Sequence, residues 1–349
     1  MRKRVTVLLL LGFACQAMAM KTATVEQMEQ LLARMHDKPD GKVAHELEDL
    51  QLTERVSPAR LAHWETAFPG SRTRQELIRL ADLSAFIDPP ASEVIPDPPP
   101  DPDTQRHMLW MAEQYMGSTM SRLPNFFATR ETTHFEAASS SKSDSADGSA
   151  KPLQWTGVTS GTVTYRGGRE ILFEAADKPD AEPPASGLTS HGEFGPILSQ
   201  VLSDALESEV RFLRWEQGPS EPAAVFHYSV PEEASHFKLD LATGGQEQPV
   251  HPAYHGEIEI DPETGAILRL SEISSMSPPH QVQSTSIEVE FAPVTIGDRT
   301  FFCPVKAVFF TRIPVPAGGA TKPNRESPDQ SSWPIETDLN DVMFSHYHE

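Results

Sequence analysis

Carboxylates at alternate positions offer the first candidate chemistry in this sequence. Glu257, Glu259 and Asp261 fall on one face of a predicted strand, and Glu288 and Glu290 fall on one face of another. A pair of such groups can exchange protons with a substrate or bind a cation. Isoleucine, valine and phenylalanine occupy the intervening positions, however, and a half-exposed sheet needs polar residues on its solvent side. We therefore predict that these carboxylates face water and form no catalytic pair.

Histidines occur in two close pairs, His251 with His255 and His346 with His348. The second pair would place both imidazoles on one face of a strand near the end of the chain. A zinc site needs three or four ligands with fixed hydrogen-bond partners, and no nearby cysteine or HExxH pattern completes either pair. The sequence therefore favours ordinary surface or partner-contacting histidines and predicts no metal site.

Nucleophiles and cofactor motifs give no better candidates. Cys303 lies in a strand-like run, which predicts a buried structural residue. Ser160 sits one place too late for a nucleophile elbow, and its context is strand to strand. No Walker loop occurs, and the adjacent Gly167 and Gly168 indicate a hairpin turn instead of a dinucleotide fingerprint. The sequence thus predicts no catalytic residue and no cofactor, and it leaves the ligand-binding residues unassigned.

The first residues have the order of a secretory signal peptide. Basic residues 2–4 precede an apolar run at residues 5–13, and small residues end the segment. We expect cleavage after Ala19, so that residues 1–19 are a signal peptide and the mature protein is periplasmic or secreted. Cys15 raises the alternative of a lipoprotein signal, which fits the residues before it less well. No later segment offers about 20 apolar residues, so no stable membrane span is expected.

The chain is strongly acidic. Its 349 residues carry 29 lysines and arginines against 50 aspartates and glutamates, a formal charge of −21, and loss of the three basic residues of the signal makes it −24. Such a chain repels phosphate backbones, so nucleic acid is excluded as a partner. Once Cys15 is removed, Cys303 is the remaining cysteine and no internal disulfide can form. A mature chain of about 330 residues can bury a core without one.

The best-specified structural element is a hairpin at residues 254–273. Apolar and polar residues alternate on both sides of a turn at residues 261–265. Asp261 suits the first turn position, Pro262 presets the second, and Gly265 accepts the left-handed backbone that closes the loop. The turn fixes the register, and the register places isoleucine and leucine on the core face.

Helical patterns dominate the first part of the mature chain. Residues 20–88 contain four short amphipathic helices and are expected to form a helical domain whose apolar stripes make its core. Residues 89–102 are rich in proline and should be an extended linker. Residues 103–122 then form a connecting amphipathic helix.

Strand patterns dominate the rest, residues 123–349, with one internal helix at residues 194–206. Disordered loops are expected near residues 137–151 and 314–334. About ten antiparallel strands with one helix imply a curved sheet folded over that helix. The expected fold is therefore α+β: a small N-terminal helical domain followed by a curved, largely antiparallel β-sheet or half-barrel.

Four stretches resemble a set of exported bacterial proteins found chiefly in acidobacteria: residues 123–136, 192–198, 254–270 and 293–305. This resemblance covers most of the mature chain and brings no catalytic residues with it. The order of strands, helix and hairpin after residue 125 is also similar in architecture to the LolA-like, LolB-like and RseB-like half-barrels of the bacterial envelope. That second similarity concerns the fold alone, and fold does not imply function.

The export signal, the alternating strands and the unassembled catalytic groups favour a non-catalytic envelope protein. We expect it to bind an apolar or lipid-like ligand, or an envelope protein partner, in the concavity of its sheet. Two alternatives stay open: an envelope hydrolase whose Glu and His residues meet only in the fold, and a scaffold that acts through its N-terminal helices. Apolar cavity walls would favour carriage, whereas converging carboxylates and imidazoles would favour catalysis.

Overall fold

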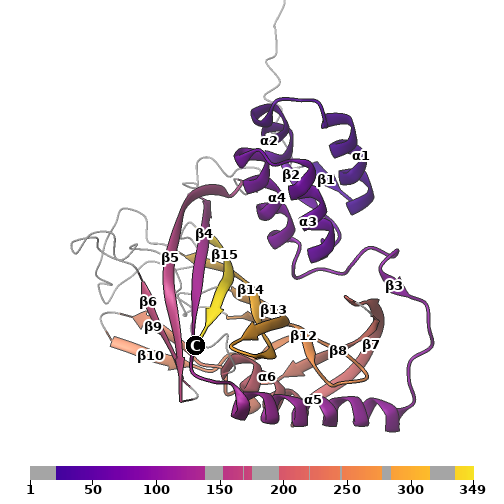
Figure 1. The fold of residues 1–349 in the computed structure, drawn as a ribbon, viewed down its shortest axis with the longest axis vertical. Helices are drawn as coiled ribbons and strands as arrows, with labels where there is room; N and C mark the ends of the chain where they lie inside the picture. The colour runs from indigo at the N-terminus through magenta and orange to yellow at the C-terminus, as the bar shows by residue number, and fades with distance from the viewer. Residues whose placement is uncertain are drawn as a thin grey trace, which may run out of the picture.

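The computed structural model describes most of the chain after residue 20: residues 21–137, 152–167, 169–174, 196–219, 221–243, 246–276, 284–314 and 335–349. The expected signal peptide with Cys15, and nearly all of the loops predicted near residues 137–151 and 314–334, lie outside the described residues. Within them, the chain forms a helical bundle, a large sheet and two further helices against that sheet (Figure 1).

The N-terminal bundle consists of α1 (Val25–Met35), α2 (Asp40–Glu48), α3 (Pro58–Ala67) and α4 (Ser71–Leu83). The four predicted helices of this region are therefore present. Thr24 begins α1 with a capping box, in which its side chain accepts from the backbone N–H of Gln27 and the Gln27 side chain accepts in return. Apolar stripes meet in a shared core that includes Met28, Leu32, Leu47, Trp64, Leu77 and Leu80.

A short parallel pair of strands closes this bundle, and the sequence patterns did not predict it. β1 (Lys21–Ala23) pairs with β2 (Leu50–Leu52). The helical spacing of Val43, Ala44, Leu47 and Leu50 predicts that the second helix continues to Leu50. Leu50 instead begins β2, where it is buried beside the helices. One apolar residue fits either period in so short a run, so tertiary packing decides between them.

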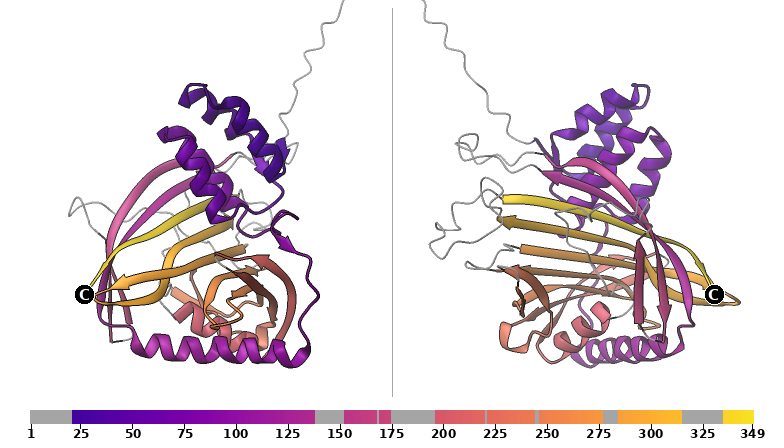
Figure 2. Two further views of the ribbon diagram at one scale, coloured as in Figure 1. Left: turned by 45° about the vertical axis from the view of Figure 1, so that its right-hand side comes forward. Right: turned by 90° about the vertical axis from the view of Figure 1, so that its left-hand side faces the viewer.

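The main sheet has eleven strands in the order β3-β7-β8-β11-β12-β13-β14-β15-β4-β5-β6, and all its pairs are antiparallel. Its strands are β3 (Val94–Ile95), β4 (Phe126–Ala137), β5 (Gln154–Arg166), β6 (Arg169–Glu174), β7 (Glu209–Gln217), β8 (Pro222–Val230), β11 (Tyr254–Ile260), β12 (Ile267–Ser275), β13 (Ser284–Ile296), β14 (Arg299–Pro314) and β15 (Ile335–His348). The sheet is strongly curved and does not close on itself (Figure 2). The expected α+β fold with a curved antiparallel sheet is confirmed.

Several strand boundaries differ from the sequence prediction. The alternation predicts one strand at residues 285–291 and another at residues 293–296. Both belong to the single strand β13, whose register slips between Glu290 and Phe291. The pattern also predicts a closing strand at residues 341–348, whereas β15 begins at Ile335. A bulge adds one residue to a strand and so interrupts the alternation by which a strand is recognised. The pattern predicts a strand at residues 236–241 and none at residues 246–250. The structure has a separate hairpin there, β9 (Leu239–Thr243) with β10 (Gln246–Val250).

The hairpin of β11 and β12 has the predicted turn. Asp261 Oδ1 accepts hydrogen bonds from the backbone N–H groups of Glu263 at 2.9 Å and Thr264 at 3.1 Å. Gly265 has a φ of 76°, the left-handed conformation that glycine adopts without a steric penalty. A Cβ at Gly265 would lie 2.6 Å from the backbone carbonyl carbon of Met111, so this turn lies directly against the long helix α5 (Pro102–Arg122).

Helices cover both faces of the sheet. On the face that we call the inner face, α5 and α6 (Pro196–Leu206) pack on apolar side chains that include Phe226, Ile258 and Leu270. On the opposite, outer face, the bundle contacts the sheet through α4. Figures 1 and 2 show the bundle and α5 on opposite sides of the strands. The chain passes between the faces at the β7 edge, where β3 pairs with β7 and the Trp215 indole donates to the Pro98 carbonyl at 3.1 Å.

Candidate functional site

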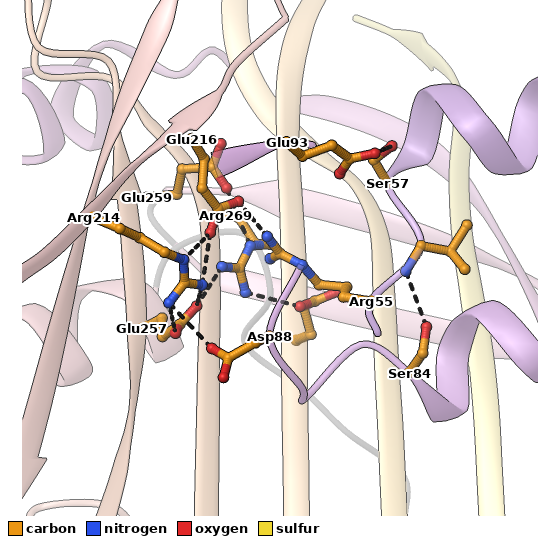
Figure 3. A network of polar contacts seen from close by, with 12 residues as sticks. Arg55, Ser57, Ser84, Asp88, Glu93, Arg214, Glu216, Glu257, Glu259 and Arg269 are labelled. Carbon is orange, nitrogen blue, oxygen red and sulfur yellow. Dashed lines mark hydrogen bonds and ion pairs between the residues drawn. The ribbon is translucent and has the colours of Figure 1, made fainter. Parts of the chain in front are cut away.

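A buried ionic cluster lies on the outer face around Arg269 of β12 (Figure 3). The guanidinium of Arg269 contacts Glu257 at 2.7 Å, Glu259 at 3.1 Å and Glu288 at 3.1 Å. The Arg269 side chain is 8% exposed, and that of Glu288 is 5% exposed. The prediction that these carboxylates face water is therefore wrong. They do form the polar side of the strands, as the alternation implied, but the helical bundle covers that side.

Two further arginines connect this cluster to the rest of the molecule. Arg214 of β7 contacts Glu257 at 2.9 Å and Glu216 at 2.6 Å. Arg55, in the segment after β2, donates to Glu216 and so joins the bundle to the sheet. These ion pairs are buried and share their carboxylates, which makes the loss of one partner costly to the others.

The neighbouring arginines shift the pKa values of these carboxyl groups. Burial alone would raise the pKa of Glu257, but Arg269 and Arg214 together lower it to about 2. Burial raises the pKa of Glu259 in spite of Arg269. Glu257 is thus held as a carboxylate that accepts protons poorly, and its role is that of a structural counter-ion.

A second charged group lies farther along the same face. Lys306 of β14 contacts Asp82 of α4 at 2.5 Å and Asp341 of β15 at 3.4 Å. Glu290 lies on β13, between β12 and β14. The strand pairing places it opposite Arg269 on one side and Lys306 on the other. Burial raises the pKa of Glu290 to about 7, although Lys306 lowers it in part. Glu290 consequently exchanges its proton near neutral pH.

The sequence patterns did not predict that Arg269 and Lys306 lie among the carboxylates, although the position of Arg269 could have been inferred. The turn at residues 261–265 sets Arg269 directly across from Glu259, and the strand pairing confirms that register. A cross-strand ion pair was therefore predictable from the hairpin. The contributions of Arg55 and Asp82 were not, since they come from a bundle whose docking no local pattern encodes.

The predicted histidine pairs do not come together as sites. His255 lies beside His227 of the neighbouring strand, with ring centroids 5.9 Å apart, and His251 is exposed in the preceding segment. His346 has a φ of 52°, and the register of β15 slips between Ser345 and His348, so its strand face is interrupted. In the described part of the chain, no three histidine, cysteine, aspartate or glutamate side chains gather as metal ligands would.

A small apolar pocket lies on the inner face, between α5, α6 and the sheet. Its volume is about 30 Å³, and its lining consists of Tyr115, Met116, Thr119, Leu123, Leu198, Ile267, Phe291, Phe302, Cys303 and Pro304. Cys303 is fully buried there, as predicted, and burial raises the pKa of its thiol to about 12. A thiol in that state is a packing residue and not a nucleophile.

Helix α5 forms one wall of this pocket with few deeply buried side chains. Met108 and Ala112 are buried in the inner-face core, whereas Met111 and Met116 are only partly buried against it. Tyr115 meets Phe302 of β14 edge to face, with ring centroids 6.2 Å apart. The contact surface of α5 is therefore rich in methionine and aromatic groups, which repack readily around different shapes.

Comparisons with known proteins add a distant structural similarity. No protein-family model matches this chain, and no curated protein does. Among solved structures, the chain is similar to a LolA superfamily protein from Nitrosomonas europaea, with 11% sequence identity and a TM-score of 0.28 over 69% of this chain and 91% of that chain. This degree of similarity assigns neither family nor function, and the resemblance to acidobacterial exported proteins stays a prediction. No helix in the described ranges is both long and apolar enough to cross a membrane.

Proposed function

We propose that this protein is a non-catalytic binding protein of the bacterial envelope that holds an apolar, lipid-like ligand between α5 and the inner face of the sheet. The observation that carries the proposal is the pocket beneath α5, whose walls are almost entirely apolar. Ligand sites of this kind combine apolar walls with few polar groups. Export is the part of the proposal that rests on the signal-like residues 1–19.

The pocket is closed in this conformation. Its volume of about 30 Å³ admits one or two water molecules and not an acyl chain. A ligand must therefore displace a wall. Between the two helices, α5 is the one with the shallower packing, because Met108 and Ala112 are the deeply buried ones among its described side chains, whereas α6 buries four apolar side chains. We infer that α5 acts as a lid that moves away from the sheet when the ligand binds.

The connections of α5 suit such a movement. The extended segment at residues 96–101 precedes the helix, and prolines keep that segment semi-rigid. Met111 lies against the turn at Gly265, and the helix would rotate about this contact as it moves away from the sheet. Methionines next to the pocket then accommodate an apolar ligand without one preferred shape.

The hydrolase alternative has less support from the geometry. Carboxylates do converge on the outer face, but Glu257, Glu259 and Glu288 all contact Arg269. His63 lines one cavity of that face, of about 710 Å³, together with several charged residues. His227 and His255 line another, of about 310 Å³, together with Asp88 and Glu257. Carboxylates and imidazoles therefore do converge on this face, but Arg269 and Arg214 lower the pKa of Glu257 to about 2, which makes it a weak proton acceptor.

Titration with a fluorescent fatty acid tests the proposed binding. Met116→Trp should fill the pocket and weaken binding at least tenfold. Glu113→Trp is the matched control, since it adds the same side chain to an exposed position of α5. Equal binding by the two variants, or the absence of saturable binding by the unmodified protein, would contradict the proposal.

A further inference from the structure

A larger cavity lies on the outer face, away from the apolar pocket. Its volume is about 710 Å³, and it runs between the segment of the bundle at residues 55–60 and the strands that carry Glu259, Arg269 and Glu288. A second cavity of about 290 Å³ adjoins it and extends toward Asp82 of α4. The two share the wall residues Val56, Pro58, Glu288, Glu290 and Val305. Together they form one groove, the outer groove, large enough for a small organic molecule.

Acidic groups outnumber basic groups along the outer groove. Its eight carboxyl side chains belong to Glu65, Asp82, Glu93, Glu216, Glu259, Glu288, Glu290 and Asp341. Its five permanent cations are Arg55, Arg60, Arg74, Arg269 and Lys306. The carboxyl side chains that line the groove thus exceed the permanent cations that line it by three, and several of them share one cation. Buried negative charge without compensation is costly, so the groove favours either protons or an added cation.

The cations of the groove are already engaged by protein carboxylates. Arg269 and Lys306 contact the groups described above, Arg55 contacts Glu216, and Arg74 contacts Glu65 at 2.8 Å. Arg60 bridges Glu29 of α1 and Glu93. An anionic ligand would therefore have to break an existing pair, whereas a cationic ligand would not.

Two carboxyl groups keep unused hydrogen-bonding capacity at the groove. Asp82 is 1% exposed, and its Oδ2 is buried with no hydrogen-bond partner in the described structure, while Oδ1 contacts Lys306. Glu290 lines both cavities and takes part in none of the ion pairs found among the described residues. Burial raises the pKa of both groups, which is the response expected of carboxyls that have no sufficient counter-charge.

We propose that the outer groove binds a small organic cation with at least two protonated amines, which Glu290 and Asp82 engage at separate points along the groove. The joined cavities, of about 710 and 290 Å³, have room for a linear polyamine, whose methylene segments would lie on Val56, Pro58 and Val305. Ammonium groups donate several hydrogen bonds and carry the charge that the groove lacks. This site is separate from the apolar pocket and does not depend on the proposed function.

Isothermal titration of the mature chain with spermidine, at low ionic strength and pH 7.5, tests this inference. We expect saturable binding that weakens at least tenfold in Glu290→Gln, a change that keeps the shape and removes the charge. Asp82→Asn should weaken binding in the same direction. Glu263→Gln removes an equivalent charge from an exposed turn outside the groove and should bind as the unmodified protein does.

Three results would overturn the inference. The first is no saturable binding of spermidine, and the second is equal binding of spermidine by Glu290→Gln and Glu263→Gln. The third is binding of Ca²⁺ or Mg²⁺ at the groove without any binding of spermidine. Asp82→Asn also removes the contact between the bundle and Lys306, so circular dichroism checks that this variant folds. If Asp82→Asn does not fold, the binding of spermidine by Glu290→Gln decides the outcome. Binding of the fatty acid should be unchanged in Glu290→Gln, so failure of this site and failure of the apolar pocket are distinguishable.

Discussion

Lys306 Nζ lies 2.5 Å from Asp82 Oδ1, which joins strand β14 to helix α4 across 224 residues of sequence. The lysine side chain is 11% exposed and the aspartate side chain 1% exposed. Asp341 shares the same ammonium at 3.4 Å. One ammonium group therefore contacts two buried carboxyl groups and joins the helical bundle to the outer face of the sheet.

Removing this lysine should destabilise the molecule strongly. Lys306→Met keeps much of the volume but leaves Asp82 and Asp341 buried without a counter-charge. We expect the free energy of unfolding, measured with urea, to fall by about 3 to 5 kcal/mol. Lys42→Met, at an exposed position of the same bundle, is the control and should change it by less than about 0.5 kcal/mol. Equal effects of the two substitutions would show that the buried pair does not hold the bundle.

Glu290 should make stability depend on pH. Its pKa is about 7 in the folded protein because of burial, against about 4.5 when unfolded, so the folded state binds more protons between these values. Protonated Glu290 therefore makes its full contribution to the free energy of unfolding below pH 4.5, and this contribution is lost as the pH rises through 7. Glu290→Gln should match the unmodified protein at pH 4.5 and exceed it at pH 8, by up to about 3 kcal/mol. A difference that is the same at both pH values would contradict a raised pKa.

Two buried carboxyls, Asp204 of α6 and Glu272 of β12, should respond to substitution in opposite ways. Asp204 accepts hydrogen bonds from the backbone N–H of His236 at 2.8 Å and from the Tyr254 hydroxyl at 2.7 Å. Glu272 is 1% exposed, and neither of its carboxyl oxygens has a hydrogen-bond partner in the described structure. Asp204→Leu should destabilise the protein by about 1 to 3 kcal/mol, whereas Glu272→Leu should be neutral or stabilising. Thermal unfolding of both variants checks this. A large loss of stability in Glu272→Leu would contradict the prediction, because it would mean that the Glu272 carboxyl makes a stabilising interaction.

Gly265 should be required for the seating of α5. Gly265→Ala combines an unfavourable φ with a Cβ only 2.6 Å from the Met111 carbonyl carbon. Gly167→Ala is the matched control, because Gly167 has a φ of 59° but open space around its Cβ position. We expect Gly167→Ala to cost about 1 kcal/mol and Gly265→Ala clearly more. Hydrogen exchange should also accelerate across residues 102–122 in Gly265→Ala alone, and its absence would show that α5 does not depend on this turn.

The fold was predictable where local chemistry and periodicity agree. The turn at Asp261 and Gly265 set the register of β11 and β12, and that register correctly placed Ile258 and Leu270 on the core face. Strand ends were less predictable where a bulge interrupts the alternation, as at Glu290. Runs of two or three residues, such as β3, carry too few positions for a period to be recognised.

The candidate site was predictable only in part. Alternation correctly placed Glu257 and Glu259 on the polar side of β11, but a polar side is not the same as a solvated one. The helical bundle covers that side of the sheet, and it reaches the sheet through Arg55 and α4, which are far away in sequence. Alternation within a strand reports which side a residue faces and contains no information about what lies against that side.

Photocrosslinking with a diazirine fatty acid, followed by peptide mapping, tests the central claim most directly. If the inner face binds an apolar ligand beneath α5, the label should attach to Tyr115, Met116 and Phe302 and be displaced by unlabelled fatty acid. Met116→Trp should lose this labelling, and Glu113→Trp should keep it. Labelling confined to the outer surface, or labelling that competitor does not reduce, would contradict the account.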